Sequence, residues 1–282
     1  MMIPKEKIGK LFGPMAIACF VAASSAAAQE QSKLDEVQDR GHVIVGVTSE
    51  APPFGFIDEN GELVGFDIDI AKLIAKTIFG DDSEDRIELQ RQSFAARWPN
   101  IQSGQIDFGV QVTTIYPDRA LRVAFTRPYI DSGITLVVPK DSPIEKPSDL
   151  NGSDYTVAHL TAPVQEERGM QHYPEANFST FDSVSAQFTA VRSGRADAAQ
   201  LDVPVAMYYA KDHDDIRVLD QWLTEPTNNA VFLRQDDFKW WLFLDTIVSE
   251  MRGGSLFNEY AEIYEKWFGS QPVHAKHYVS SN

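Results

Sequence analysis

NIQSGQIDFGVQV, residues 100–112, and AVRSGRADAAQLD, residues 190–202, are two versions of one pattern, ninety positions apart. In both, a segment with apolar residues at helical spacing leads into Ser-Gly, and an aspartate three positions after the glycine precedes an apolar run. Glycine in this place suits a helix C-terminus. Two copies of helix, glycine, aspartate and strand predict two α/β lobes of the same design.

The ends of the two predicted strands indicate where a ligand would bind. The first strand ends at Val112, close to Thr114, and the second ends at Asp202. Open α/β sheets bind ligands beyond the carboxyl ends of their strands. Val112 and Asp202 each lie five positions after the aspartate of their motif, so we expect two half-sites that face each other across a cleft.

The segments before the first motif predict the start of an α/β lobe. Residues 42–47 (HVIVGV) are typical of a buried strand, and residues 58–61 (DENG) carry hairpin turn chemistry. Apolar residues from Phe66 to Ile78 recur at the spacing of one helix face.

Two short apolar strands, residues 133–139 and 229–233, are expected to carry the chain between the lobes. Two crossings return the C-terminal part to the first lobe, where residues 238–251 and 256–267 predict packing helices. The predicted organisation is a signal peptide at 1–28, the first part of lobe one at 33–132, lobe two at 133–228, the return to lobe one at 229–270, and a polar tail at 271–282.

The N-terminus has the order of a secretory signal peptide: three lysines, an apolar run over residues 11–23, and small residues ending in AAA at 26–28. The apolar run is shorter than the ~20 residues that a membrane span needs. We expect cleavage before Gln29 and export to the periplasm. An uncleaved anchoring helix, or lipidation of Cys19, is the alternative.

Charge and cysteine content exclude several kinds of function. Cys19 is the only cysteine, so a chain cleaved before Gln29 has neither a disulfide nor a thiolate metal site. A net charge of −16 argues against nucleic acid as a partner, because phosphate binding needs a basic patch. The sequence has no nucleophile elbow, dinucleotide fingerprint or H-E-x-x-H motif, and its six histidines are scattered. We expect no metal, no cofactor and no enzymatic activity.

Several stretches resemble the periplasmic amino-acid-binding proteins of ABC transporters, which are extracellular solute-binding proteins of family 3. They are GELVGFDIDIAKLIA (61–75), the segment 100–129 with TTIYPDR and FTRPY, SGRADAAQLD (193–202) and EKWFG (265–269). The resemblance implies an α/β, two-lobed periplasmic-binding-protein-like fold with two hinge strands, closing on one small-molecule ligand. It also implies a membrane permease as partner. We expect the protein itself to be a monomer.

The resemblance further implies a set of ligand-binding residues. Arg119 matches the arginine that grips the ligand's α-carboxylate, a task that suits a planar guanidinium. Thr114 matches the residue that joins this grip, and Asp202 matches the aspartate that receives the α-ammonium. Thr161 matches a threonine at the start of a lobe-two helix. The candidate pocket is completed by Val112, Phe54 and Glu50.

Four of these assignments have a structural alternative. Arg119 could pair with neighbouring Asp118 at the surface, while Thr114 and Asp202 could cap helices. Phe54 could be a core residue. These alternatives stay open at the level of the sequence.

Departures from the family pattern leave the bound side chain open. Ala51 stands where the family often has an aromatic residue that stacks on the ligand, and no basic residue lies near Thr48. Leu160 and Ala162 flank Thr161 where a glycine and further threonines are common.

Other functions fit the same fold. A dehydratase or a lytic transglycosylase would use cleft groups for acid-base work, with Glu50 and His159 as the candidates here. A ligand sensor that docks on a membrane receptor and a binder of organic acids or opines are further alternatives. The pairing of Arg119 with Asp202 favours capture of a zwitterion.

Overall fold

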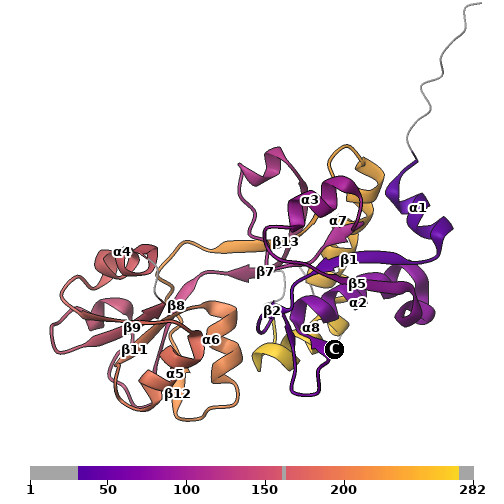
Figure 1. Ribbon diagram of the computed structural model, residues 1–282. Helices are drawn as coiled ribbons and strands as arrows, with labels where there is room; N and C mark the ends of the chain where they lie inside the picture. The colour runs from indigo at the N-terminus through magenta and orange to yellow at the C-terminus, as the bar shows by residue number, and fades with distance from the viewer. Residues whose placement is uncertain (1–30, 161–162, 273–282) are drawn as a thin grey trace, which may run out of the picture. The chain divides into compact units, whose positions relative to one another are not determined.

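The computed structural model describes residues 31–160 and 163–272 (Figure 1). The predicted signal peptide, its cleavage site and Cys19 lie outside the described residues, as do Thr161 and most of the polar tail.

The first lobe is built on a five-stranded sheet in the order β5-β1-β6-β13-β7. β1 runs parallel to β5 and β6, and β13 runs antiparallel to β6 and β7. Val45 and Ile44 of β1 pack into two different core clusters, which explains why this strand is apolar on both faces. The strands are β1 (Val43–Val47), β5 (Ile87–Arg91), β6 (Phe108–Gly109), β7 (Ala124–Ser132) and β13 (Thr227–Leu233).

The second lobe repeats this plan in a sheet of order β10-β9-β11-β8-β12. β9 runs parallel to β10 and β11, and β8 runs antiparallel to β11 and β12. In both sheets three parallel strands are followed by an antiparallel one. The strands are β8 (Ile134–Pro139), β9 (Thr156–Leu160), β10 (Asn177–Phe181), β11 (Ala198–Asp202) and β12 (Ile216–Val218).

The two Ser-Gly motifs occupy equivalent places in the two lobes. The first follows α3 (Arg97–Ser103) and the second follows α5 (Val184–Arg192). Gly104 and Gly194 both adopt left-handed backbone conformations, with φ of 75° and 70°, which end the helices without steric cost. The predicted internal repeat is confirmed.

The aspartate of each motif ties the motif to the neighbouring parallel strand. Oδ2 of Asp107 accepts a hydrogen bond of 2.7 Å from the N–H of Ile44, and Oδ2 of Asp197 accepts one of 2.8 Å from Thr156. Each aspartate also donates its own N–H to the carbonyl of the same partner, at 2.8 Å. The repeated spacing of the motif therefore has a structural cause within each lobe.

Helices α2 and α8 and strand β7 contribute to one aromatic core in the first lobe. Phe66, at the start of α2, lies 6.0 Å from Tyr129, 6.2 Å from Tyr260 and 4.9 Å from Phe268, measured between ring centroids. The predicted helices near residues 66, 238 and 256 are confirmed as α2, α7 and α8. Besides α3 and α5, the helices are α1 (Lys33–Arg40), α2 (Phe66–Phe79), α4 (Pro163–His172), α6 (Val203–Ala210), α7 (Phe238–Gly253), α8 (Phe257–Phe268) and the 3₁₀ turns η1 (Gly80–Arg86), η2 (Arg119–Leu121) and η3 (Pro147–Leu150).

A small antiparallel sheet follows β1 and contains the predicted hairpin. Its turn is held by Asp58, whose Oδ1 accepts hydrogen bonds from the N–H groups of Asn60 (2.9 Å) and Glu62 (2.8 Å). The strands are β2 (Glu50–Ala51), β3 (Gly55–Ile57) and β4 (Leu63–Val64).

The chain passes between the two large sheets at two places that lie side by side (Figure 1). β8 pairs entirely within the second sheet and β13 within the first, so the passages fall at Gly133 and just before Thr227. Gly133 has no room for a side chain, because a Cβ there would lie 2.4 Å from the Trp222 ring.

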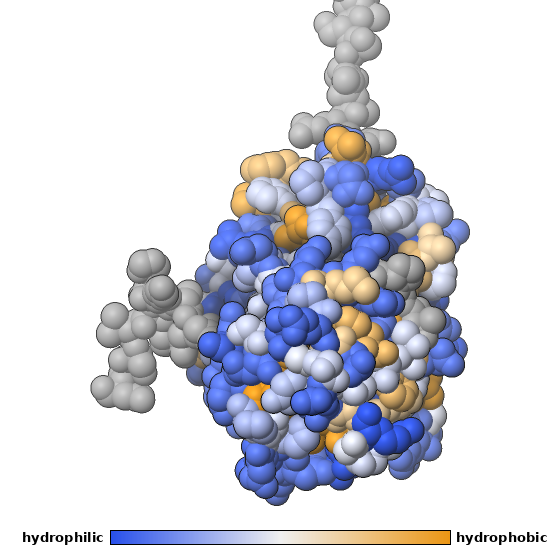
Figure 2. All heavy atoms as spheres, turned by 90° about the vertical axis from the view of Figure 1, so that its left-hand side faces the viewer, coloured by the Kyte–Doolittle hydropathy of each residue, from blue (hydrophilic) through white to orange (hydrophobic). Residues whose placement is uncertain are grey.

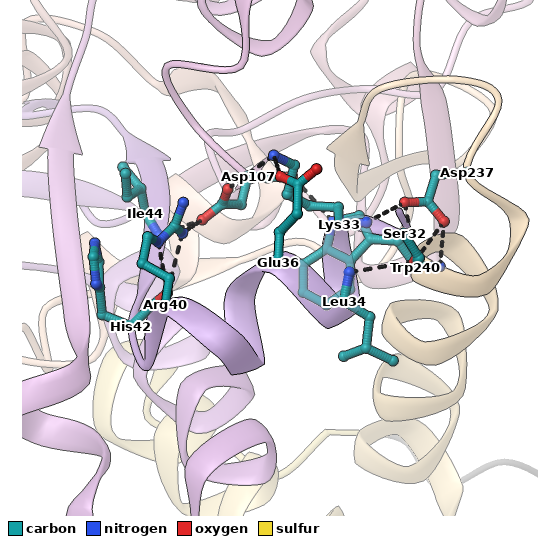
Figure 3. Close-up of polar contacts among 10 residues, drawn as sticks. All are labelled: Ser32, Lys33, Leu34, Glu36, Arg40, His42, Ile44, Asp107, Asp237 and Trp240. Carbon is teal, nitrogen blue, oxygen red and sulfur yellow. Dashed lines mark hydrogen bonds and ion pairs between the residues drawn. The ribbon is translucent and has the colours of Figure 1, made fainter. Parts of the chain in front are cut away.

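The N-terminal helix α1 is fastened to the first lobe at both of its ends (Figure 3). At its start, Asp237 accepts hydrogen bonds from the hydroxyl of Ser32 (2.8 Å) and the N–H of Lys33 (2.6 Å), and it also caps α7. At its other end, Arg40 forms an ion pair with the buried carboxylate of Asp107.

Apolar side chains are sparse on the face of the molecule shown in Figure 2, where they form small separate groups among hydrophilic residues. Within the described residues, no helix has the length and apolar character needed to cross a membrane.

Candidate functional site

A cavity of about 430 Å³ lies at the carboxyl ends of β6 and β11 and is lined by residues of both lobes. A larger hollow of about 620 Å³ lies between α2 and α8, but it is rimmed mainly by surface lysines and carboxylates. None of the expected site residues that the structure describes lines this larger hollow. The residues lining the first cavity are Ala51, Pro52, Phe54, Val112, Thr114, Tyr116, Ser132, Gly133, Ile134, Arg168, Asp202, Val205, Thr224, Thr227 and Asn229.

Asp202 supplies a carboxylate from the second lobe. β11 is buried up to its last residue, Asp202, which is exposed to the cavity. Although Asp202 stands at the N-cap position of α6, its side chain makes no capping hydrogen bond. The crowded walls desolvate the group and raise its pKa, while the nearby charge of Arg168 opposes that rise. The carboxylate is therefore available to a cation in the cavity.

Thr114 and Arg119 supply the facing half-site from the first lobe. The Thr114 hydroxyl donates to Oδ1 of Asn229 at 3.1 Å, and the Thr114 carbonyl accepts from Nη1 of Arg119 at 2.8 Å. The Arg119 guanidinium lies 4.9 Å from the centroid of the Tyr116 ring. Arg119 thus contacts two lining residues without lining the cavity itself, and in the described part of the chain no ion pair joins it to Asp118.

Arg97 adds a second positive charge behind this half-site. Its Nη1 donates to the Thr113 hydroxyl at 3.2 Å, and its buried Nε has no partner among the described residues. Burial, together with the charge of Arg119, lowers the pKa of Arg97 to about 10. Two neighbouring guanidinium groups favour an anionic group on this side of the cavity.

Val112 lines the cavity in a strained conformation that a buried carboxylate maintains. Its φ of 41° lies in the left-handed region, which is unusual for a β-branched residue. The Val112 N–H donates to Oδ2 of Asp67 at 2.8 Å, and the hydroxyl of Tyr129 donates to Oδ1 of the same side chain at 2.7 Å. The N–H of Val112 is therefore committed to Asp67, and Val112 shapes the cavity through its position.

The buried Asp67 predicts a pH dependence of stability. Desolvation raises its pKa to about 7, against the lowering effect of its two hydrogen bonds, so between the unfolded pKa near 4 and about 7 the folded state binds more protons. The free energy of unfolding should therefore fall as the pH rises through this window. Asp67→Asn, which imitates the protonated acid, should flatten the slope. Urea unfolding at several pH values measures it, and an unchanged slope in the variant would contradict this origin.

The other expected site residues lie in different surroundings. Phe54 both lines the cavity and packs in the core, 6.4 Å from Phe66 between ring centroids. Glu50 is exposed and is not among the lining residues. Ala51 lines the cavity at the position where an aromatic residue was expected from the family. Tyr116, which lies between β6 and β7, is an aromatic residue of the lining.

Residues 43–270 match the family model described as bacterial extracellular solute-binding proteins, family 3. The chain is 30% identical over 261 residues to the ABC transporter glutamine-binding protein of Bacillus subtilis, covering 91% of this chain and 93% of the relative.

Two solved structures extend the comparison. An ancestral cationic amino acid solute-binding protein is 33% identical, with a TM-score of 0.74, and the match covers 84% of this chain and all of that one. An ancestral cyclohexadienyl dehydratase is 27% identical, with a TM-score of 0.62 and coverage of 85% and 98%.

Proposed function

The chain belongs to the bacterial extracellular solute-binding proteins of family 3, and from this premise we propose that it captures an amino acid and delivers it to the membrane permease of an ABC transporter. One observation carries the proposal. A single cavity brings the uncapped carboxylate of Asp202 opposite the loop that Arg119 and Thr114 organise.

The arrangement suits a zwitterion. The α-ammonium of an amino acid would pair with Asp202. Its α-carboxylate would accept hydrogen bonds from Arg119, which lies against the lining residues Thr114 and Tyr116, and from the hydroxyl of Thr114 once that hydroxyl turns away from Asn229. Arg97 strengthens the positive potential on the carboxylate side. Because the two charges of one ligand are held by different lobes, binding favours the arrangement in which the lobes enclose it. The cavity volume of about 430 Å³ falls in the range of small-molecule pockets.

We propose that the protein works in the periplasm as a monomer after removal of residues 1–28. The basic, apolar and small residues of that segment support export. Glutamine binding by the Bacillus subtilis relative makes glutamine a reasonable first ligand to test.

We propose that the protein binds its ligand without converting it. Glu50 does not line the cavity, and His159 is buried, with its Nδ1 2.9 Å from the carbonyl of Leu160. Neither candidate for acid-base work stands beside Asp202 in the lining of the cavity.

A thermal-shift screen tests the proposal. L-amino acids, the corresponding 2-hydroxy acids and the corresponding amines are compared. An L-amino acid at 100-fold its dissociation constant should stabilise the protein by about 2.7 kcal/mol, while molecules with only one of the two charges should stabilise it far less. Recovery of the ligand unchanged after long incubation supports binding without catalysis. If no L-amino acid raises the melting temperature, or if a product accumulates, the proposal is wrong.

A further inference from the structure

Arg168 of α4 is a charged residue of the cavity wall. The proposed contacts to the α-ammonium and the α-carboxylate of an amino acid do not involve it. It lines the cavity with Asp202 and Thr224, and it also borders a neighbouring hollow whose rim includes Glu167 and Glu225. Its Nη1 is buried and has no hydrogen-bond partner among the described residues. A buried donor of this kind costs free energy until an acceptor reaches it.

The surroundings of Arg168 contain carboxylates, but none in the described part of the chain forms an ion pair with it. Arg168 and Asp202 line the same cavity, and the positive charge of Arg168 opposes the rise in the pKa of Asp202. They are the only charged side chains among the described residues that line the cavity. With Asp202 taken by an α-ammonium, Arg168 is the positive charge that the rest of the ligand meets.

We propose that Arg168 binds the side chain of the captured amino acid, and that this side chain ends in a carboxylate or a carboxamide. The inference rests on the proposed function, because Asp202 and Arg119 must hold the two backbone charges. A guanidinium donates readily to such oxygens and repels a cationic side chain. Thr224 borders the same part of the wall, and its Oγ1 accepts from the N–H of Ile134 at 3.1 Å, which leaves the hydroxyl hydrogen free to donate.

This assignment separates the chain from its ancestral neighbour. That neighbour is described as binding cationic amino acids, whereas a guanidinium whose Nη1 has no hydrogen-bond partner among the described residues disfavours them in the wall of this cavity. Selectivity among amino acids would thus come from Arg168, a residue in none of the motifs that carry the family resemblance.

Calorimetry with four ligands tests the assignment: L-glutamate, L-glutamine, L-alanine and L-arginine. The wild type should bind glutamate or glutamine at least about tenfold more tightly than arginine. In Arg168→Met, the affinity for the preferred ligand should fall about tenfold or more, the affinity for alanine should change little, and the affinity for arginine should rise. Arg168→Lys keeps the charge beside Asp202 but loses the planar fork, so its loss should be smaller and again confined to glutamate and glutamine.

The control is Arg195→Met, an exposed arginine of the same lobe, which should bind all four ligands like the wild type. A wild-type preference for arginine overturns the assignment, and so does an equal loss for all four ligands in Arg168→Met, because that would mean Arg168 acts through Asp202 or the fold. If the wild type binds none of the ligands and the wider screen finds no other amino acid, the proposed function itself fails. Tighter binding of glutamate than of glutamine identifies the carboxylate as the matching group, and the reverse order identifies the carboxamide.

Discussion

Replacing Asp107 by alanine should destabilise the protein by about 3 kcal/mol, although the residue is not among those that line the cavity. The carboxylate is buried, and it pairs with Arg40 and with Lys33, whose Nζ lies 3.8 Å from Oδ1 (Figure 3). It also accepts from the N–H of Ile44 at the start of β1. The variant leaves that partly buried N–H without its acceptor and removes the anion that pairs with Arg40 and Lys33 of α1. Urea unfolding measures the change, and a loss below about 1 kcal/mol would contradict it.

Asp197→Ala is the matched control, because Asp197 holds the same place in the second motif. It accepts from the N–H of Thr156, but no ion pair to it is found among the described residues. Asp197→Ala should therefore lower the free energy of unfolding by about 1–2 kcal/mol, because only a backbone donor loses its acceptor. An equal cost for both variants would show that the cations around Asp107 contribute nothing.

The architecture could be predicted from the sequence because the information is local and repeated. A glycine that ends a helix, an aspartate three positions later and an apolar strand form a short unit, and its two copies at 103–107 and 193–197 occupy equivalent places in the two sheets. The helices near residues 66, 238 and 256 were predictable because their apolar residues recur at helical spacing over several turns.

Much of the cavity could not be predicted, because it depends on contacts between residues distant in sequence. Asp67 holds the backbone of Val112 across forty-five positions, and nothing near either residue indicates the contact. Arg97 of α3 is brought to the half-site by its hydrogen bond to the Thr113 hydroxyl, where the charge of Arg119 acts on it. Arg168 of α4 and Asp202 at the end of β11 line one cavity although they are distant in sequence, and no motif near Arg168 indicates this.

The half-sites from the two lobes give the largest expected effects on binding. Asp202→Asn keeps the shape of the side chain but leaves a desolvated ammonium without its anion, which should weaken amino-acid binding by about 2 to 5 kcal/mol. Arg119→Lys keeps the charge but loses the planar fork, including the hydrogen bond from Nη1 to the Thr114 carbonyl, so binding should again weaken substantially. Calorimetry with the preferred amino acid measures both losses.

The matching 2-hydroxy acid separates the two roles, since it has the carboxylate and lacks the ammonium. It should bind the wild type weakly and lose little more in Asp202→Asn, whereas Arg119→Lys should weaken both ligands. The amino acid and the 2-hydroxy acid, each measured with wild type and variant, form a double cycle. The difference between their losses of binding free energy isolates the interaction of the ammonium with Asp202. The side chain of Asp202 makes no capping hydrogen bond to α6, so Asp202→Asn removes no helix cap, and the melting temperature of the free variant checks that the fold is kept. Amino-acid binding by Asp202→Asn as tight as that of the wild type would remove the main support for a zwitterion in the cavity.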